Sequence, residues 1–223
     1  MTKKLFFGAI LKFVLGVVVV GLLIFLPAGS FSYFYGWLLM GLLFIPMLIA
    51  GIVMMIKSPT LLESRLNAKE NQKEQGLVQK LSGLMFIVGF VLSGLGYRFG
   101  WYVLPLWVVI IGAILFVMAY VIYAEVLREN AYLSRTIEVQ EGQKVIDTGL
   151  YGIVRHPMYS ATILLFLAMP LILGSIFALL VFLIYPFIIA FRIKYEEEFL
   201  EKELEGYKEY KQKVKWRMIP FIW

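Results

Sequence analysis

The chain has 223 residues, of which 61% are hydrophobic and 16% charged, and this composition excludes a soluble domain and indicates a multi-pass membrane protein. It contains no cysteine and one histidine, which excludes disulfides and cysteine nucleophiles and disfavours any metal centre. The net charge of +6 is typical of basic loops facing anionic lipid, so we expect membrane lipids and no nucleic acid as partners.

Two apolar runs at the start of the chain predict two membrane-spanning helices. Residues 5–26 are long enough to cross a bilayer, and Lys12 is tolerable there because its side chain can extend to the surface. The run is longer than the core of a signal peptide, and no A-x-A cleavage motif follows it. A turn at 27–35 leads into residues 36–56, with Pro46 as an expected kink.

Residues 57–80 are polar, and Ser58-Pro59 resembles the start of a helix. The apolar positions in this segment are Leu61, Leu62, Leu66 and Val78. Their spacing allows part of the segment to lie on the membrane surface, but a solvated loop explains it equally well.

Three further apolar runs follow, and together they predict four spans. Residues 81–97 and 101–127 predict two spans around a turn at 98–100, and residues 128–147 are polar again. The stretch 160–193 is too long for one span and predicts a tight helical hairpin. Its turn is expected at Leu173-Gly174-Ser175, with kinks at Pro170 and Pro186.

The fold class is therefore all-α, a transmembrane bundle of about six spans with both termini cytoplasmic and a C-terminal amphipathic helix. In this topology the outer loops are 27–35, 98–100 and 173–175. Of the 21 Lys and Arg residues only Arg98 falls in an outer loop, which is the asymmetry that the positive-inside rule predicts. The polar segments and the C-terminal region should then share the cytoplasmic face.

The only histidine lies in the motif Gly149-x-Tyr151-x-x-x-Arg155-His156-Pro157-x-Tyr159. Pro157 restricts His156 to an extended conformation and is favourable at the start of a helix. His156 and Tyr159 would then lie at a helix N-terminus, whose amides can bind an anion. Taken singly, these residues are more typical of an interfacial belt.

A second cluster, Arg192 to Leu200, follows the hairpin. Arg192 and Glu196 are four residues apart and share a helix face. The adjacent carboxylates of Glu196 and Glu197 are costly at the end of an apolar helix unless a positive group offsets them. An ordinary salt bridge on a solvated helix end is the alternative. Beyond it, a common stripe favours a surface-lying anchor and consists of Leu200, Leu204, Tyr207, Lys211 and Val214.

The two clusters, the hairpin between them, and Gly206-Tyr207, Tyr210, Val214 and Pro220 form one ordered pattern. This pattern resembles the isoprenylcysteine carboxyl methyltransferases and, more broadly, the membrane phospholipid methyltransferase group. The resemblance covers residues 125–223. We expect a single membrane domain in which residues 1–124 form a transmembrane scaffold and residues 125–223 carry the cofactor site.

The resemblance implies S-adenosylmethionine as the cofactor, bound without a Rossmann domain, and no G-x-G-x-x-G follows a predicted strand here. The cofactor positions that it implies are Tyr151, His156, Pro157, Met158, Tyr159, Glu196 and Glu197. A connecting segment of variable length adds Gln140, Lys144, Val145 and Ile146. Arg192 and Glu196 are the catalytic candidates, with Arg192 on the substrate side.

The chemistry agrees with these roles and predicts an integral-membrane methyltransferase. Glu196 can pair with the ammonium of the cofactor, and His156 with the helix amides can meet its carboxylate. Tyrosine rings can face the sulfonium, and Arg192 can orient a carboxylate acceptor. The expected acceptor is lipophilic and enters from the bilayer, either a prenylated-cysteine-type carboxylate or a lipid head group.

Two other classes of protein share some of these features. Membrane sterol reductases that use NADPH also carry R-H-P-x-Y, but their pattern has an Asp and a Cys before K-Y-G, where this chain has Glu196-Glu197 and Glu205-Gly206-Tyr207. A transporter or non-enzymatic protein is a weaker alternative, because the predicted spans contain almost no polar residues apart from Lys12.

Overall fold

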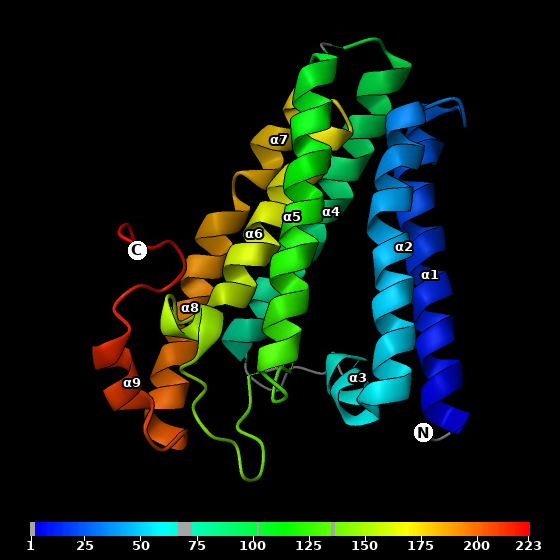
Figure 1. Cartoon of the computed structure of the whole chain (residues 1–223). Coiled ribbons are helices and arrows are strands. Elements are labelled where there is room, and N and C mark those ends of the chain that lie inside the picture. The colour runs from blue at the N-terminus through cyan, green and yellow to red at the C-terminus, as the bar shows by residue number, and fades with distance from the viewer. Residues whose placement is uncertain (1–2, 67–72, 102, 135–136) are drawn as a thin grey trace.

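The computed structural model of the chain is all-helical and describes residues 3–66, 73–101, 103–134 and 137–223 (Figure 1). The predicted fold class is confirmed, since no strand occurs within these ranges. The elements are α1 (Lys3–Ala28), α2 (Phe34–Lys57), α3 (Pro59–Leu66), α4 (Lys73–Arg98), α5 (Leu106–Glu129), a 3₁₀ turn (Gly149–Gly152), α6 (Pro157–Ile172), α7 (Ile176–Phe182), α8 (Tyr185–Glu203) and α9 (Tyr207–Lys213).

In the described part of the chain, five helical segments are long and apolar enough to cross a membrane. They are α1, α2, α4, α5, and α7 with α8 taken together. Helix α6 is apolar but has 16 residues, about 24 Å at ~1.5 Å per residue, against a hydrocarbon core of ~30 Å. The chain is an integral-membrane protein, and the number of spans and the side of the termini remain predictions.

The outer surface of the bundle is apolar, as a lipid environment requires. Large side chains such as Leu11, Leu26, Ile56 and Phe187 are more than two-thirds exposed, at 68%, 73%, 76% and 76%. In water, contiguous apolar surface of this kind would drive association, whereas in a bilayer it is the lipid-facing side of a helix whose backbone groups are satisfied internally.

The predicted polar segment 57–80 is divided between two helices and residues 67–72, which lie outside the described residues. Leu61 and Leu62 of α3 are buried in the protein, so this part is neither a solvated loop nor a helix that turns its apolar side to the membrane surface. Val78 is also buried, but in α4.

Helix α5 begins at Leu106 and not at residue 101 as predicted. Leu104 precedes a proline, which disfavours helical backbone at that position. Its N–H instead donates to the carbonyl of Gly174, 2.9 Å away, and Val103 forms an isolated bridge with Ser175. The extended segment therefore ties the α4–α5 connection to the hairpin turn.

The hairpin turn lies where the sequence predicts it. Helix α6 ends at Ile172, Gly174 adopts a left-handed conformation with φ +66°, and the Ser175 hydroxyl caps α7. The second arm is broken after Phe182, and Pro186 lies in the first turn of α8, so this proline starts a new helix and does not kink a continuous one.

The C-terminal stripe packs inward, so its interpretation as a surface anchor is wrong. Gly206, with φ +82°, separates α8 from the short α9. The buried side chains that follow form one cluster, consisting of Leu204, Tyr207, Tyr210 and Val214. Val139 and Val145 of the connecting segment pack against it.

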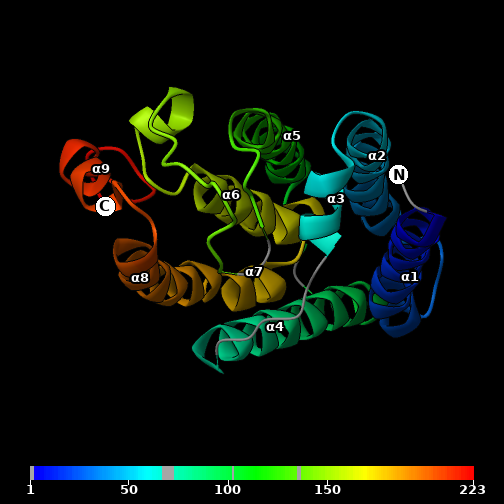
Figure 2. The same cartoon turned by 90° about the horizontal axis from the view of Figure 1, so that it is seen from below.

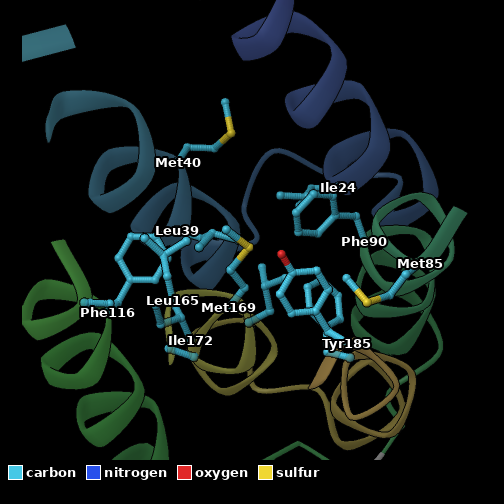
Figure 3. Close-up of a cluster of buried hydrophobic side chains, with 14 of the residues drawn as sticks. Ile24, Leu39, Met40, Met85, Phe90, Phe116, Leu165, Met169, Ile172 and Tyr185 are labelled. Atoms are coloured by element: carbon cyan, nitrogen blue, oxygen red, sulfur yellow. The ribbon is translucent and has the colours of Figure 1, made fainter. Parts of the chain in front are cut away.

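Close helix packing organises the membrane part. Helix α5 lies along α6 and α1 lies along α4 (Figure 2). A Cβ at Gly94 would lie 2.9 Å from the Ala28 nitrogen, and one at Gly112 would lie 2.7 Å from Leu171 Cβ, so both contacts require glycine. In the described part of the chain the core gathers side chains from seven helices, α1, α2 and α4 to α8, and includes Ile24, Leu39, Phe90, Phe116, Met169 and Tyr185 (Figure 3).

The polar elements collect at one end of the bundle. Helices α3 and α9 and the loop after α5 lie at the lower end in Figure 1, together with the N-terminus. The α1–α2, α4–α5 and α6–α7 connections lie at the upper end. This arrangement agrees with the predicted common face for the polar segments.

Candidate active site

The histidine motif begins in a tight turn against the end of α5. Gly149 has φ +51°, and a Cβ at this position would overlap the Glu129 carboxylate, which accepts a bond from the Leu150 N–H at 3.1 Å. The chain then reaches His156, which caps α6, and Pro157 occupies the first turn. The predicted position of His156 at a helix N-terminus is therefore found.

The C-terminal coil, residues 214–223 after α9, runs beside the motif. Its backbone carbonyls accept hydrogen bonds from the motif and from the first turns of α6. The N–H of Arg155 donates to Trp216 O at 2.9 Å, and the N–H of His156 donates to Arg217 O at 2.8 Å. The Ser160 hydroxyl donates to Met218 O at 2.7 Å. The amides of Arg155 and His156 are thus occupied, and the expected contact between the N-terminal amides of α6 and the cofactor carboxylate stays a prediction.

One group of polar side chains, the Glu196 triad, joins the start of α6 to α8 and consists of Tyr159, Arg192 and Glu196. The Tyr159 hydroxyl donates to Glu196 Oε2 at 2.5 Å and accepts from Arg192 Nε at 2.7 Å. The His156 ring stacks on Tyr159, and its Nδ1 lies 3.9 Å from Glu196 Oε1. The Glu196 side chain is 21% exposed, so a ligand can reach it.

A second group, the Glu197 cluster, is centred on a carboxylate that is only 2% exposed. Arg155 Nε and His156 Nε2 lie 2.7 Å and 3.2 Å from Glu197 Oε1. Arg217 Nε and Lys211 Nζ lie 3.1 Å and 3.6 Å from Oε2. Both carboxylate oxygens are therefore paired, as burial of such a charge requires.

A cavity of about 340 Å³ lies on the Glu197 side of α8. It is lined by Ala190, Lys194, Glu197, Glu198, Lys211, Arg217 and Trp223. Consecutive helical residues point about 100° apart, so Glu196 and Glu197 face different sides of α8. The cavity and the Glu196 triad thus occupy two sides of the same helix.

Residues 107–206 match the model of the family described as phospholipid methyltransferase. These residues form a phospholipid methyltransferase domain. The match confirms the family resemblance drawn from the motifs, and it supports a membrane methyltransferase of the phospholipid or isoprenylcysteine type. No curated protein matches the chain.

The remaining motif residues of the methyltransferase domain are held in place by neighbouring elements. Tyr151 is buried, and burial raises its pKa to about 12, so its phenol stays neutral. Its hydroxyl accepts from Asn130 Nδ2 at 3.0 Å, and its carbonyl accepts from the Tyr210 hydroxyl at 2.8 Å. The Met158 sulfur lies 3.8 Å from Arg65 Nη1.

The connecting segment of the domain is placed against its own loop and α9. Gln140 Nε2 donates to Tyr132 O at 2.8 Å, Lys144 is exposed, and Ile146 is half-buried. Val145 packs on the C-terminal cluster. The assignment of these four residues to the cofactor stays a prediction.

The sequence reasoning missed the basic partners of Glu197. Arg155 lies inside the motif but received no role, and Lys211 and Arg217 were not connected with Glu197. The need for a positive group beside the paired carboxylates was predicted, but chain spacing does not show which group supplies it. Arg65 of α3 was missed as well, since nothing in its local sequence links it to Met158.

Proposed function

We propose that this protein is an integral-membrane methyltransferase that takes its methyl group from S-adenosylmethionine and transfers it to a lipophilic acceptor. The observation that carries the proposal is the hydrogen-bonded chain from Arg192 through Tyr159 to Glu196 inside the phospholipid methyltransferase domain. The acceptor enters from the bilayer and presents a prenylated-cysteine-type carboxylate or a lipid head group.

The residues at the triad fit this cofactor. A carboxylate has about four lone-pair sites, and Tyr159 occupies one site on Glu196, so an ammonium can bind the same side chain. Tyrosine rings attract a sulfonium through their π faces. When bound, the cofactor supplies a methyl group that is already activated. Pro157 and Met158, at the start of α6, would add apolar contacts to the cofactor.

Because the methyl group is already activated, the main role of the protein is to align the methyl donor with the acceptor. The Tyr159 hydroxyl contacts both charged partners, so it fixes Arg192 relative to Glu196. Arg192 is 9% exposed, and its planar guanidinium suits a carboxylate acceptor. Tyr159 packs against the hydrophobic core, which would keep water away from the reacting groups. No strong base is required for a carboxylate, whereas an amine acceptor must first lose a proton.

The cofactor assignment is tested by calorimetry on the purified full chain. We expect S-adenosylmethionine to bind the wild type, and Glu196→Ala to weaken binding by at least about 10- to 100-fold, because a charged hydrogen bond is lost. Glu209→Ala, which removes an exposed carboxylate on α9, is the matched control. Absence of binding by the wild type contradicts the proposal, and binding of NADPH instead supports a reductase.

The acceptor is identified by methyl transfer in membranes that contain the overproduced protein. Radiolabelled methyl groups should appear in a lipid-soluble product whose structure names the acceptor class. The same preparation carrying Glu196→Ala should lack the labelled product.

We also propose that the triad faces the cytoplasm, because the basic polar segments share its end of the bundle. The chain has no cysteine, so single cysteines report topology without background. In intact cells a membrane-impermeant maleimide should modify Ser32→Cys, and it should modify Glu209→Cys only after permeabilisation. The reverse pattern contradicts this orientation.

A further inference from the structure

Helix α3 lies outside residues 107–206 but docks onto the methyltransferase domain. In Figure 1 it lies between the lower ends of α2 and α5. The Ser64 hydroxyl lies 3.1 Å from Leu133 O and 2.9 Å from Leu61 O of its own helix, and Arg65 Nη1 donates to Ser134 O at 3.1 Å. From α1, Lys12 Nζ donates to Leu66 O at 2.6 Å, which satisfies a carbonyl at the C-terminal end of α3.

The docking brings one guanidinium into the site. Arg65 Nη1 lies 3.8 Å from the sulfur of Met158, the residue directly before Tyr159 of the triad. Arg65 Nη2 donates to the Tyr123 hydroxyl, and its guanidinium carbon lies 5.6 Å above the ring of the same tyrosine. A residue of the N-terminal half thus reaches the start of α6.

Electrostatics place Arg65 and Glu196 in one neighbourhood. Both charges act on Tyr151, whose pKa is raised to about 12, mainly by burial; the Glu196 charge contributes to the rise and the Arg65 charge opposes it. The positive charge of Arg65 and the negative charge of Glu196 therefore both lie near Tyr151.

The guanidinium of Arg65 is half-buried and has neutral partners. Its contacts are a backbone carbonyl, a phenol and a thioether, and no carboxylate among the described residues lies within 4.0 Å of it. Burial of a charge without a counter-charge is unfavourable. Arg155 shows the contrast, since it pairs with Glu197 and with the carbonyls of Val214 and Lys215.

We propose that Arg65 binds an oxyanion of the acceptor other than the reacting group that Arg192 orients, a phosphate or carboxylate carried by an amphiphile, and so holds the head group beside Met158. The planar fork of arginine matches both oxyanions in a bidentate geometry, and the Tyr123 hydroxyl lies beside it. This inference rests on the proposed function, because it assigns the acceptor side of the same site. Helix α3 then selects the substrate for a domain to which it does not belong.

Calorimetry with the full chain in neutral-detergent micelles tests the proposal, with dodecyl phosphate as the probe. We expect the wild type to bind it and Arg65→Gln to bind it about 10- to 100-fold more weakly. Arg128→Gln is the matched control, since Arg128 pairs with Glu125 on the exposed side of α5. If Arg65→Gln binds the probe like the wild type, or if the wild type does not bind it, the proposal is wrong.

Two further titrations exclude other ligands. S-adenosylmethionine should bind Arg65→Gln as it binds the wild type; an equal loss for the cofactor means that Arg65 holds the cofactor and overturns the proposal. Inorganic phosphate should bind the wild type far more weakly than dodecyl phosphate, and equal affinity also overturns it. Failure of the wild type to bind the cofactor is a separate result that concerns only the proposed function.

A conservative variant keeps the test decisive if Arg65→Gln does not fold. Arg65→Lys retains the charge but not the planar fork, so we expect probe binding about tenfold weaker than in the wild type with the cofactor affinity unchanged. Unchanged probe affinity in Arg65→Lys contradicts the bidentate contact.

Discussion

Glu196 and Glu197 follow one another on α8, but their surroundings differ in kind. Glu196 is 21% exposed and is bonded to the Tyr159 hydroxyl, whereas Glu197 is 2% exposed and lies among four basic side chains. His156 stands between them, with Nδ1 toward Glu196 and Nε2 toward Glu197. Of these two consecutive glutamates, Glu196 therefore has room to bind a ligand, whereas Glu197 links the C-terminal coil to α6 and α8.

The two carboxylates therefore have different roles, and that of Glu197 is structural. The Glu197 cluster holds Arg155, His156 and Arg217 in register, and so positions the ring that stacks on Tyr159. Glu197 also lines the cavity on its side of α8. Its expected contact with the cofactor stays a prediction. Substitutions at Glu197, Tyr159 and Arg217 separate the two roles.

Removal of Glu197 should have the largest effect. Glu197→Ala leaves the buried Arg155 and the partly exposed Arg217 and Lys211 without their counter-charge, and loss of the partner of a buried charge typically costs about 3–5 kcal/mol of folding free energy. We expect a strongly lowered midpoint of thermal denaturation in detergent and loss of monodisperse protein. Glu196→Ala, on the same helix, should remain folded, and equal destabilisation by both variants would contradict the division of roles.

Tyr159→Phe should affect chemistry more than folding. The hydroxyl joins Arg192 to Glu196, so its removal lets both groups move relative to each other. We expect methyl transfer to fall about 10- to 100-fold, from the loss of hydrogen bonds to charged groups, while the denaturation midpoint changes little. A wild-type rate in this variant would remove Tyr159 from the alignment role.

Arg217→Ala should weaken the Glu197 cluster without destroying it. Its side chain is 32% exposed, and Arg155 and His156 still pair with the carboxylate, so the expected cost is about 1 kcal/mol. Thermal denaturation should rank this variant between the wild type and Glu197→Ala. If Arg217→Ala lowers the denaturation midpoint as much as Glu197→Ala does, the stability would depend on the packing of the C-terminal coil and not on the charge of Glu197.

Asp147→Asn should have the smallest effect. Lys213 donates to Asp147 at 2.6 Å and holds the pKa of this carboxyl below its usual value, but both groups are exposed. Because the folded-state pKa is lowered, any stabilisation exists above the unfolded pKa and is lost as the pH falls through the folded value. The denaturation midpoint of the variant should match the wild type at neutral pH and high salt.

Much of the fold could be predicted from apolar length and turn residues. The runs at 5–26 and 36–56 became α1 and α2, and Gly174 marked the hairpin turn. The meeting of Tyr159 with Arg192 and Glu196 followed from placing both ends of the hairpin on one face.

Other contacts leave no periodic signal in the chain. The coil that pairs with Arg155 and His156 does so through backbone groups, which every residue has. The partners of Glu197 come from distant segments and could be recognised only as a general need for positive charge. The docking of α3 depends on Ser64 and Arg65, whose spacing is ordinary for a polar helix.

The pairing of the C-terminal coil with the start of α6 also sets an order of events during synthesis. Met218, which accepts from Ser160, is made 58 residues later. At ~5–20 residues per second the ribosome needs roughly 3–12 s for this length, and the hairpin lies within it. The amides of Arg155 and His156 find their partners only after that interval. These contacts around the candidate site therefore form only after the whole hairpin has been synthesised.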